Sequence, residues 1–429
     1  MEMQFSESLY PLTFRAKDAQ ALGQHLRLRH SVELVGMKHV GISNFLQFFL
    51  YHGSIVKTYI RQGRHMFVAV DLNDLVERDM FAFWILVLKR FADKAETFPD
   101  IALADKKTIS ALFLNSIQSR NFFLAFENLR EIIKIIIRNN ILPTIFLIRF
   151  DRIRDTVSEE FLANLQGLRD ATGQKLAYVF TSFRALDDLA PEVFSRKSLS
   201  VFSHLMYIRG ANEADMKIIF ETFEKKYKTK IVSSVLAKLI ELCGGHVQYL
   251  QIALIIINGT KQKVSAQNLL SLLVRDERVG LISEEIWECL TEIEKAAVKK
   301  IIEGVEIANG QLPEYLTETG VATGNGRQVI FSPLFENFVK KIIRSRGGEA
   351  VDFTKKENLL YNLLLSNIGD ICERETIIST VWSEYEDMGV SDWTIDQLVA
   401  RLRIKLKLQK SPYAVKTVRT RGYRLVEES

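Results

Sequence analysis

The strongest constraint on the fold is an alternation of short apolar runs with longer segments of helical periodicity between residues 31 and 210. These runs are apolar throughout, as strands buried on both faces are. They predict strands at SVELVG, HMFVAVDLN, PTIFLIRFD and KLAYVFTSF, with SHLMYIRG as a fifth. Because strands that alternate with helices form βαβ units, we expect a parallel sheet covered by helices on both faces.

A short loop, GMKHVGISN at 36–44, follows the first apolar run and precedes a helical segment. Gly36, Gly41 and Ser43 have the spacing of a phosphate-binding loop, in which backbone N–H groups at a helix N-terminus hold phosphate oxygens. Such loops carry a lysine before the hydroxyl residue, but this chain has Ile42 there. The alternatives are a working nucleotide site, a disabled one and a chance spacing of glycines.

Asp151 and Arg152 bear on what this loop could do. The third apolar run ends in Asp151, where a carboxylate for Mg²⁺ is expected, and an ordinary acid at a strand end is the alternative. Since Ile42 and Arg152 replace two groups that hydrolysis needs, we expect no catalytic residue, no resident metal and no efficient ATP hydrolysis. ATP or ADP with Mg²⁺ is the only cofactor that the pattern suggests. The candidate nucleotide-binding residues are Gly36, Lys38, Gly41, Ser43, Asn44 and Asp151.

Residues 211–345 are mostly helical in pattern. CGGH at 243–246 places two glycines before a helix and is followed by Val247. GNGRQVIFS at 324–332 is a hairpin signal between helices, which is typical of a winged helix. TSFR at 181–184 puts polar groups at the end of the fourth apolar run.

With these features, residues 31–345 resemble a STAND/AAA+-type P-loop ATPase module. Val247 stands where that family's G-G-x-P element has its proline, and TSFR where relatives carry a sensor residue and an arginine. The resemblance implies a core at 31–210, a helical lid at 211–280 and a winged-helix-like domain at 281–345, after an N-terminal segment at 1–30. His246 is then either a ligand or, as we expect, a structural histidine.

Basic residues concentrate near the C-terminus. Residues 391–425 hold nine Lys and Arg against two Asp, or +7, whereas the whole chain carries +5. Three leucines recur at helical spacing and would face a core: Leu398, Leu402 and Leu406. We expect Arg401 and Lys405 to project outward from the same helix. A basic helix beside a basic hairpin suits DNA, because each neutralised phosphate releases counterions; a solvated charged helix is the alternative.

A longer pattern covers residues 353–425 in order and spacing. It runs through F-T-x-x-E from Phe353, L-L-x-x-x-G from Leu364, R-E at Arg374, V-W at Val381, R-L-R-x-K-L from Arg401 and T-V-R-x-x-G-Y-R-L from Thr417. On these motifs the segment resembles the OmpR/PhoB-type winged-helix DNA-binding domain of bacterial response regulators. The resemblance implies a third helix in the major groove of double-stranded DNA and a hairpin in the adjacent minor groove. The residues that it implies for DNA contact are Arg374, Thr394, Gln397, Arg401, Arg403, Lys405, Arg419 and Arg421.

Other features exclude several classes of protein. The most apolar stretch, IIKIIIRNNILPTIFLIRF, is interrupted by Lys134, Arg138 and Pro143, and a membrane span needs about 20 apolar residues. We therefore expect no membrane segment. The three cysteines make no CxxC or Cys/His spacing, so neither a zinc site nor a disulfide framework is expected.

Together these segments predict a multidomain α/β plus α+β protein: a P-loop NTPase-like parallel sheet, a helical lid and two winged-helix domains, with a linker at 346–352 before the domain at 353–429. We expect a cytoplasmic bacterial transcriptional regulator in which a non-hydrolysing ATPase-like module controls an OmpR-type output domain. No acidic cluster with a following lysine has receiver-domain spacing, so we expect control other than aspartyl phosphorylation. RNA polymerase and a second copy of the chain are further expected partners. The alternatives are an active STAND-type signalling ATPase and an initiator-like AAA+ DNA-binding protein.

Overall fold

The computed structural model describes residues 10–75, 79–193, 204–227, 231–260, 263–308, 310–324, 327–345, 353, 355–382, 392–409, 411–418 and 421–427. Within these ranges, the side chains of residues 226, 227, 345, 355, 392–394, 397, 404 and 408 are not described. The chain divides into two compact units, Met1–Val339 and Lys340–Ser429. The predicted linker at 346–352 lies outside the described residues.

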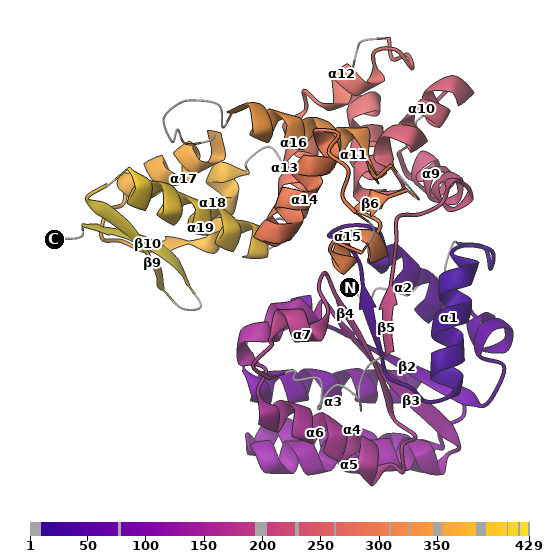
Figure 1. The fold of residues 1–429 in the computed structure, drawn as a ribbon. Helices are drawn as coiled ribbons and strands as arrows, with labels where there is room; N and C mark the ends of the chain where they lie inside the picture. The colour runs from indigo at the N-terminus through magenta and orange to yellow at the C-terminus, as the bar shows by residue number, and fades with distance from the viewer. Residues whose placement is uncertain are drawn as a thin grey trace. The chain divides into compact units, whose positions relative to one another are not determined.

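The larger unit is built on a five-stranded parallel sheet (Figure 1). Its strands are β1 (Val32–Val35), β2 (Arg64–Asp71), β3 (Ile141–Ile148), β4 (Ala177–Ser182) and β5 (His204–Tyr207), in the order β2-β3-β4-β1-β5. Every neighbouring pair is parallel. The predicted strands and the parallel sheet are confirmed, and the architecture is that of a P-loop NTPase-like α/β domain.

Helices cover both faces of the sheet, because alternate residues of each strand point to opposite faces. Val68 and Val70 of β2 belong to the core under α3 (Met80–Thr97), α5 (Phe122–Arg138) and α6 (Glu159–Ala171). On the other face, Phe67 of β2 and Phe146 of β3 contact Phe49 of α2 (Ile42–Tyr51). The helix α1 (Ala16–Arg27) precedes β1, and Ser158 caps α6 through the N–H of Phe161.

The helix α4 (Leu103–Ser119) was not predicted from the sequence. Its apolar residues do not form one stripe, and Leu103, Leu114 and Ile117 remain exposed. Short one-turn elements complete this part: η1 (Val56–Ile60), η2 (Leu72–Asp74), η3 (Phe150–Thr156) and α7 (Leu186–Leu189).

The rest of the larger unit is helical, as predicted. It holds α9 (Glu213–Tyr227), α10 (Ser233–Cys243), α11 (Val247–Gly259), α12 (Leu269–Leu273), α13 (Glu277–Glu288), α14 (Glu292–Ile302) and α15 (Glu314–Glu318). The last helix, α16 (Pro333–Ser345), begins in this unit and ends in the residues assigned to the smaller one. The hairpin signal at 324–332 forms an antiparallel pair, β6 (Ala322–Thr323) with β7 (Val329–Ile330). The boundary proposed between residues 280 and 281 falls inside α13.

The smaller unit contains α17 (Lys355–Leu365), β8 (Cys372–Glu373), α18 (Arg374–Val381), α19 (Asp392–Leu408), β9 (Tyr413–Val418) and β10 (Gly422–Glu427). The strands form an antiparallel sheet in the order β8-β10-β9, and β9 and β10 make the C-terminal hairpin. Gly422 lies so close to the carbonyl of Cys372 that a side chain has no room, which explains a glycine in that motif. Among the described residues, no helix has the length and apolar character to cross a membrane.

Candidate nucleotide site and nucleic-acid interface

The loop at 36–44 lies at the carboxyl end of β1 and leads into α2, as a phosphate-binding loop does. Gly41 is the N-cap of α2 and has a φ of 111°, in the left-handed region that favours glycine. The side chain of Ile42 turns back toward Gly36, because a Cβ on Gly36 would lie 3.3 Å from Ile42 Cδ1. Ser43 is exposed on the first turn of α2. An apolar group thus occupies the position of the missing lysine.

Residues of the lid lie directly on this loop. Val247 at the start of α11 packs so closely on Gly41 that a Cβ there has no room. His246 is buried, and its Nδ1 accepts the N–H of Tyr249 as the N-cap of α11. The proton is therefore on Nε2, which donates to the carbonyl of Lys38 at 2.8 Å. Burial lowers the pKa of His246 to about 3, so it is neutral. The expectation of a structural histidine is confirmed.

A second contact joins the loop to α13, where His39 Nε2 lies 2.6 Å from Glu285 Oε2. Helix α13 and the N-cap residue of α11 therefore hold a side chain and a carbonyl of the loop. Val247, which stands where the family has its proline, places an apolar side chain against the turn of the loop.

Lys38 lies close enough to Asp151 to act on the charge of its carboxylate. Burial raises the pKa of Asp151, and the charge that opposes this most is Lys38. Lys38 Nζ also lies 5.3 Å from the centre of the Phe183 ring, beyond the end of β4. A lysine ammonium is thus near the carboxylate that was expected to serve Mg²⁺.

The expectation that the third strand ends in Asp151 is wrong. The strand β3 ends at Ile148, Arg149 adopts a left-handed conformation, and Asp151 lies in the 3-10 turn η3. Arg149 forms an ion pair with Asp71, and its N–H donates to Thr181 Oγ1. A backbone turn of this kind cannot be foreseen from apolar periodicity alone.

Arg152 is tied to the end of a neighbouring strand, since its Nη1 donates to Asn73 Oδ1 at 2.7 Å. No carboxylate occupies the position after Asp151. The sequence therefore supplies no water-activating base at this point, and the structure attaches the substituting arginine to the turn after β2.

Arg15, which no sequence motif marks, lies beside the loop. Its residue is 4% exposed, and Nη1 donates to Asp18 and to the carbonyl of Arg209. Among the described residues, Nε and Nη2 have no hydrogen-bond partner. Nη2 lies 3.7 Å from where a Cβ on Gly41 would stand. Two buried N–H donor groups of this guanidinium thus point to an acceptor beside a phosphate-type loop, because such donors are rarely left unpaired.

Asn44, another candidate, donates from Nδ2 to the hydroxyl of Tyr10 at 2.7 Å. Tyr10 is itself buried and stacks on Phe14. The N-terminal segment therefore reaches the first turn of α2, and Asn44 holds it there.

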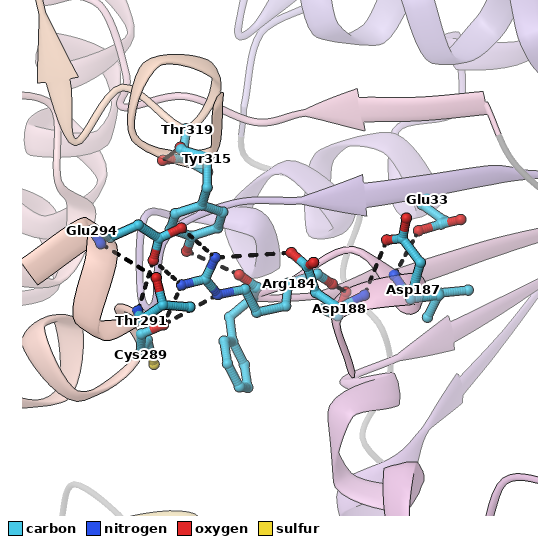
Figure 2. A network of polar contacts seen from close by, with 12 residues as sticks. Glu33, Arg184, Asp187, Asp188, Cys289, Thr291, Glu294, Tyr315 and Thr319 are labelled. Carbon is cyan, nitrogen blue, oxygen red and sulfur yellow. Dashed lines mark hydrogen bonds and ion pairs between the residues drawn. The ribbon is translucent and has the colours of Figure 1, made fainter. Parts of the chain in front are cut away.

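Arg184 is the centre of a polar network that joins the end of β4 to α14 (Figure 2). Its guanidinium donates to both carboxylate oxygens of Glu294 and to the carbonyl of Cys289. It also stacks on Tyr315, 3.7 Å from the ring centre, and lies 3.9 Å from Asp188. The arginine at this position is thus engaged by the winged-helix-like region.

In the smaller unit, the carboxylate of Glu357 is paired with two basic residues of α19. This carboxylate is 1% exposed in α17, and Lys405 Nζ lies 2.6 Å from it. Arg401 Nε lies 3.7 Å from the other oxygen. The expectation that Arg401 and Lys405 project outward is therefore wrong: both flank α17. The buried leucine stripe of α19, in contrast, is confirmed: Leu398, Leu402 and Leu406.

Two further candidates make internal contacts. Arg374 donates to Asp396 Oδ1 at 2.6 Å and to the hydroxyl of Tyr423. Arg403 donates to the carbonyl of Val415 and to Thr417 Oγ1, both at 2.7 Å, and so joins α19 to β9. Burial, together with Asp396, raises the pKa of Tyr423, which is a core residue.

Lys407 near the end of α19, Lys416 in β9 and Arg421 at the hairpin turn are exposed basic residues. Arg421 pairs with Glu373 at 3.2 Å, and both side chains are more than half exposed. Of the other candidates, Arg419 lies outside the described residues, and Thr394 and Gln397 are placed in α19 without described side chains. Lys407 and Lys416 belong to the basic segment at 391–425, but no motif marks either of them as a DNA contact.

Comparison with known proteins decides the nature of the smaller unit. Residues 348–425 match the family model described as "Transcriptional regulatory protein, C terminal". The chain carries this domain at its C-terminus. Transcriptional regulatory protein PcoR of Escherichia coli is 38% identical over 78 residues, 18% of this chain and 34% of PcoR. Heme response regulator HssR of Staphylococcus epidermidis is 38% identical over 80 residues, again 18% and 34%. The chain thus spans about a third of the length of these relatives.

Solved structures resemble a larger part of the chain. A Walker-type ATPase of Pyrococcus abyssi matches 77% of this chain and 96% of its own, at 14% identity and a TM-score of 0.49. The structure of ORC2 of Aeropyrum pernix covers 80% of this chain and 97% of its own chain, at 13% identity and a TM-score of 0.47. ORC1 of Aeropyrum pernix, solved in complex with DNA, matches 100% and 92%, at 10% identity and a TM-score of 0.41. The fold of the larger unit is defined by the strand order of its parallel sheet, β2-β3-β4-β1-β5.

Proposed function

We propose that this chain is a DNA-binding transcriptional regulator in which an ATPase-like module that does not hydrolyse ATP controls an OmpR-type output domain. The observation that carries the proposal is the match of residues 348–425, together with the helix α19 and the hairpin β9–β10 that this segment folds into. PcoR and HssR are both named as regulators, and the same output is proposed here.

The basic surface of the smaller unit supports duplex DNA as the partner. Lys407 lies on the helix that would enter the major groove, and Lys416 and Arg421 lie on the hairpin. Arg401, Lys405, Arg374 and Arg403 have protein partners, so we propose that they shape and position this surface as much as they contact phosphate. Thr394, Gln397 and Arg419 remain proposed DNA contacts.

Three features of the larger unit support a module without turnover. Ile42 presents an apolar side chain where the lysine would stand, Lys38 lies near Asp151, and Arg152 takes the place of a carboxylate. Nucleotide binding is still supported by Arg15 next to Gly41, since Nε and Nη2 of this arginine have no hydrogen-bond partner among the described residues. We therefore propose a site that holds ATP or ADP as a ligand, with Gly36, Gly41, Ser43 and Asn44 around it, and relays occupancy through α11 and α13.

The experiment combines two assays on the purified chain. A selection from random-sequence duplex DNA, followed by footprinting, is expected to yield one protected site, and failure to retain any duplex at low salt would reject the DNA-binding proposal. In parallel, phosphate release from Mg²⁺-ATP is measured beside Asp151→Ala. Equal background rates support a module without turnover, whereas turnover that this change abolishes would favour the alternative of an active STAND-type ATPase.

The other partners follow from this proposal. A regulator of this type acts on transcription, so RNA polymerase is a proposed partner, and a second copy of the chain is another. The initiator-like alternative predicts duplex opening and not only duplex binding. Footprinting with a probe for unpaired bases separates these two outcomes.

A further inference from the structure

Three histidines from separate parts of the larger unit meet at the amino edge of the sheet. His25 lies in the last turn of α1, His30 precedes β1, and His204 is the first residue of β5. The backbone brings them together: the N–H of His30 donates to the carbonyl of His25, and the N–H of His204 donates to Ser31. Because β1 and β5 are parallel, this edge is opposite to the loop at 36–44.

The imidazoles are close enough to share one ligand. Their ring centres are 4.3 Å apart for His30 and His204, 4.6 Å for His25 and His204, and 5.8 Å for His25 and His30. One nitrogen from each ring lies within 4.8 Å of the other two. His30 Nδ1 is buried and has no hydrogen-bond partner among the described residues. Buried polar atoms are normally hydrogen-bonded or bound to an ion, so an unpartnered ring nitrogen beside two more imidazoles indicates a ligand-binding position.

We propose that His25, His30 and His204 form a binding site for one divalent transition-metal ion, such as Zn²⁺, Co²⁺, Ni²⁺ or Cu²⁺. Imidazole nitrogen is a ligand for these ions, whereas Mg²⁺ and Ca²⁺ require oxygen ligands, and the cluster contains no carboxylate. With bonds of about 2.0–2.1 Å, tetrahedral ligands lie about 3.3 Å apart, so the rings need to approach by roughly 1–1.5 Å. The exposed His204 can make most of this movement.

The surroundings fit a site of moderate affinity. Three protein ligands leave a fourth position for water on the exposed side of His204. Arg169, which donates to the carbonyl of Arg29, also acts on His30, and its positive charge weakens the attraction for any cation. Binding would therefore rest on the nitrogen–metal bonds, and not on net charge. A bound ion would join α1 to β1 and β5, and so fix the edge strand that leads into the lid.

The test is a titration of the full, chelator-treated chain with Zn²⁺ by calorimetry and with Co²⁺ by visible absorption. We expect one ion per chain, d–d bands typical of histidine ligation, and a higher Tm on binding. His204→Ala and His25→Asn are each expected to weaken binding by more than about tenfold, as losing a ligand should cost at least what losing its supporting contact does. His52→Ala, which removes a histidine outside the cluster, is the matched control.

Circular dichroism of the metal-free variants establishes that they fold. Because the two variants change different positions, the test remains possible if one of them does not fold. Binding that is saturable in the wild type and in His52→Ala but weakened in both cluster variants supports the site. No saturable binding, or binding of equal strength in the cluster variants, would overturn it.

Discussion

Arg184 and Glu294 form a buried, two-pronged ion pair that joins the end of β4 to α14 (Figure 2). The two side chains are 8% and 6% exposed. Burial alone would raise the pKa of Glu294, but the hydrogen bonds from Arg184 and Thr291 outweigh it and lower this pKa. The pair therefore ties the P-loop-like core to the winged-helix-like region that follows the lid.

Breaking this pair should destabilise the larger unit. Glu294→Gln keeps the capping interaction with Thr291 but leaves the guanidinium of Arg184 with only the more distant, exposed carboxylate of Asp188, 3.9 Å away. We expect a loss of about 3–5 kcal/mol in the free energy of unfolding, measured by urea denaturation. Glu213→Gln, which disrupts an exposed and solvent-screened pair with Lys217, is the control and should leave the free energy of unfolding nearly unchanged. Equal effects of the two changes would contradict a buried clamp.

Acid should destabilise the larger unit through His246. Its pKa falls from 6.5 to about 3 on folding because of burial, so the unfolded chain binds the proton more readily. The contribution of neutral His246 to the free energy of unfolding is fully present above pH 6.5. It is lost as the pH falls toward 3, at about 1.4 kcal/mol per pH unit. His246→Asn retains an N-cap oxygen for α11 and should flatten this slope. An unchanged slope between pH 6.5 and 4 would contradict the assignment.

Glu357 should be essential to the stability of the smaller unit, because its buried carboxylate pairs with two cations. Glu357→Gln removes the charge shared by Lys405 and Arg401, and we expect about 3 kcal/mol of destabilisation. The measurement is thermal unfolding followed by circular dichroism, with Lys416→Ala as an exposed control. If Glu357→Gln were neutral, the ion pairs around α17 would not stabilise the domain.

Restoring the lysine of the loop should improve nucleotide binding without producing turnover. Ile42→Lys supplies the cation that reaches the phosphates, but Arg152 still replaces the water-activating carboxylate. We expect tighter binding of a fluorescent ATP analogue and no phosphate release above that of Asp151→Ala. Turnover by Ile42→Lys would mean that the lysine alone had been lost from an otherwise competent site.

Much of the fold follows from local patterns in the sequence. The five strands were predictable because each is an apolar run between helical segments, and the buried stripe of α19 because its leucines recur at helical spacing. The helix α4 escaped prediction because its apolar residues stay partly exposed. The location of the loop at 36–44 was also predictable, because its glycines directly follow the apolar run that forms β1.

The sites were less predictable, because they depend on partners distant in the chain. Arg401 and Lys405 were expected to face outward, and only the fold brings them to Glu357. Asp151 was expected at a strand end, but the left-handed Arg149 turns the chain before it. Arg15 carries no motif and is near Gly41 only after folding.

The most direct test of the account is the salt dependence of duplex DNA binding by the full chain, followed by fluorescence anisotropy on the selected site. We predict that log K falls linearly with log salt concentration, and that Lys407→Ala and Arg421→Ala each reduce the slope by about 0.9. Lys89→Ala, an exposed change in the larger unit, should leave the slope unaltered. Binding that is absent, or whose slope is the same in all three variants, would contradict the proposed DNA-binding surface.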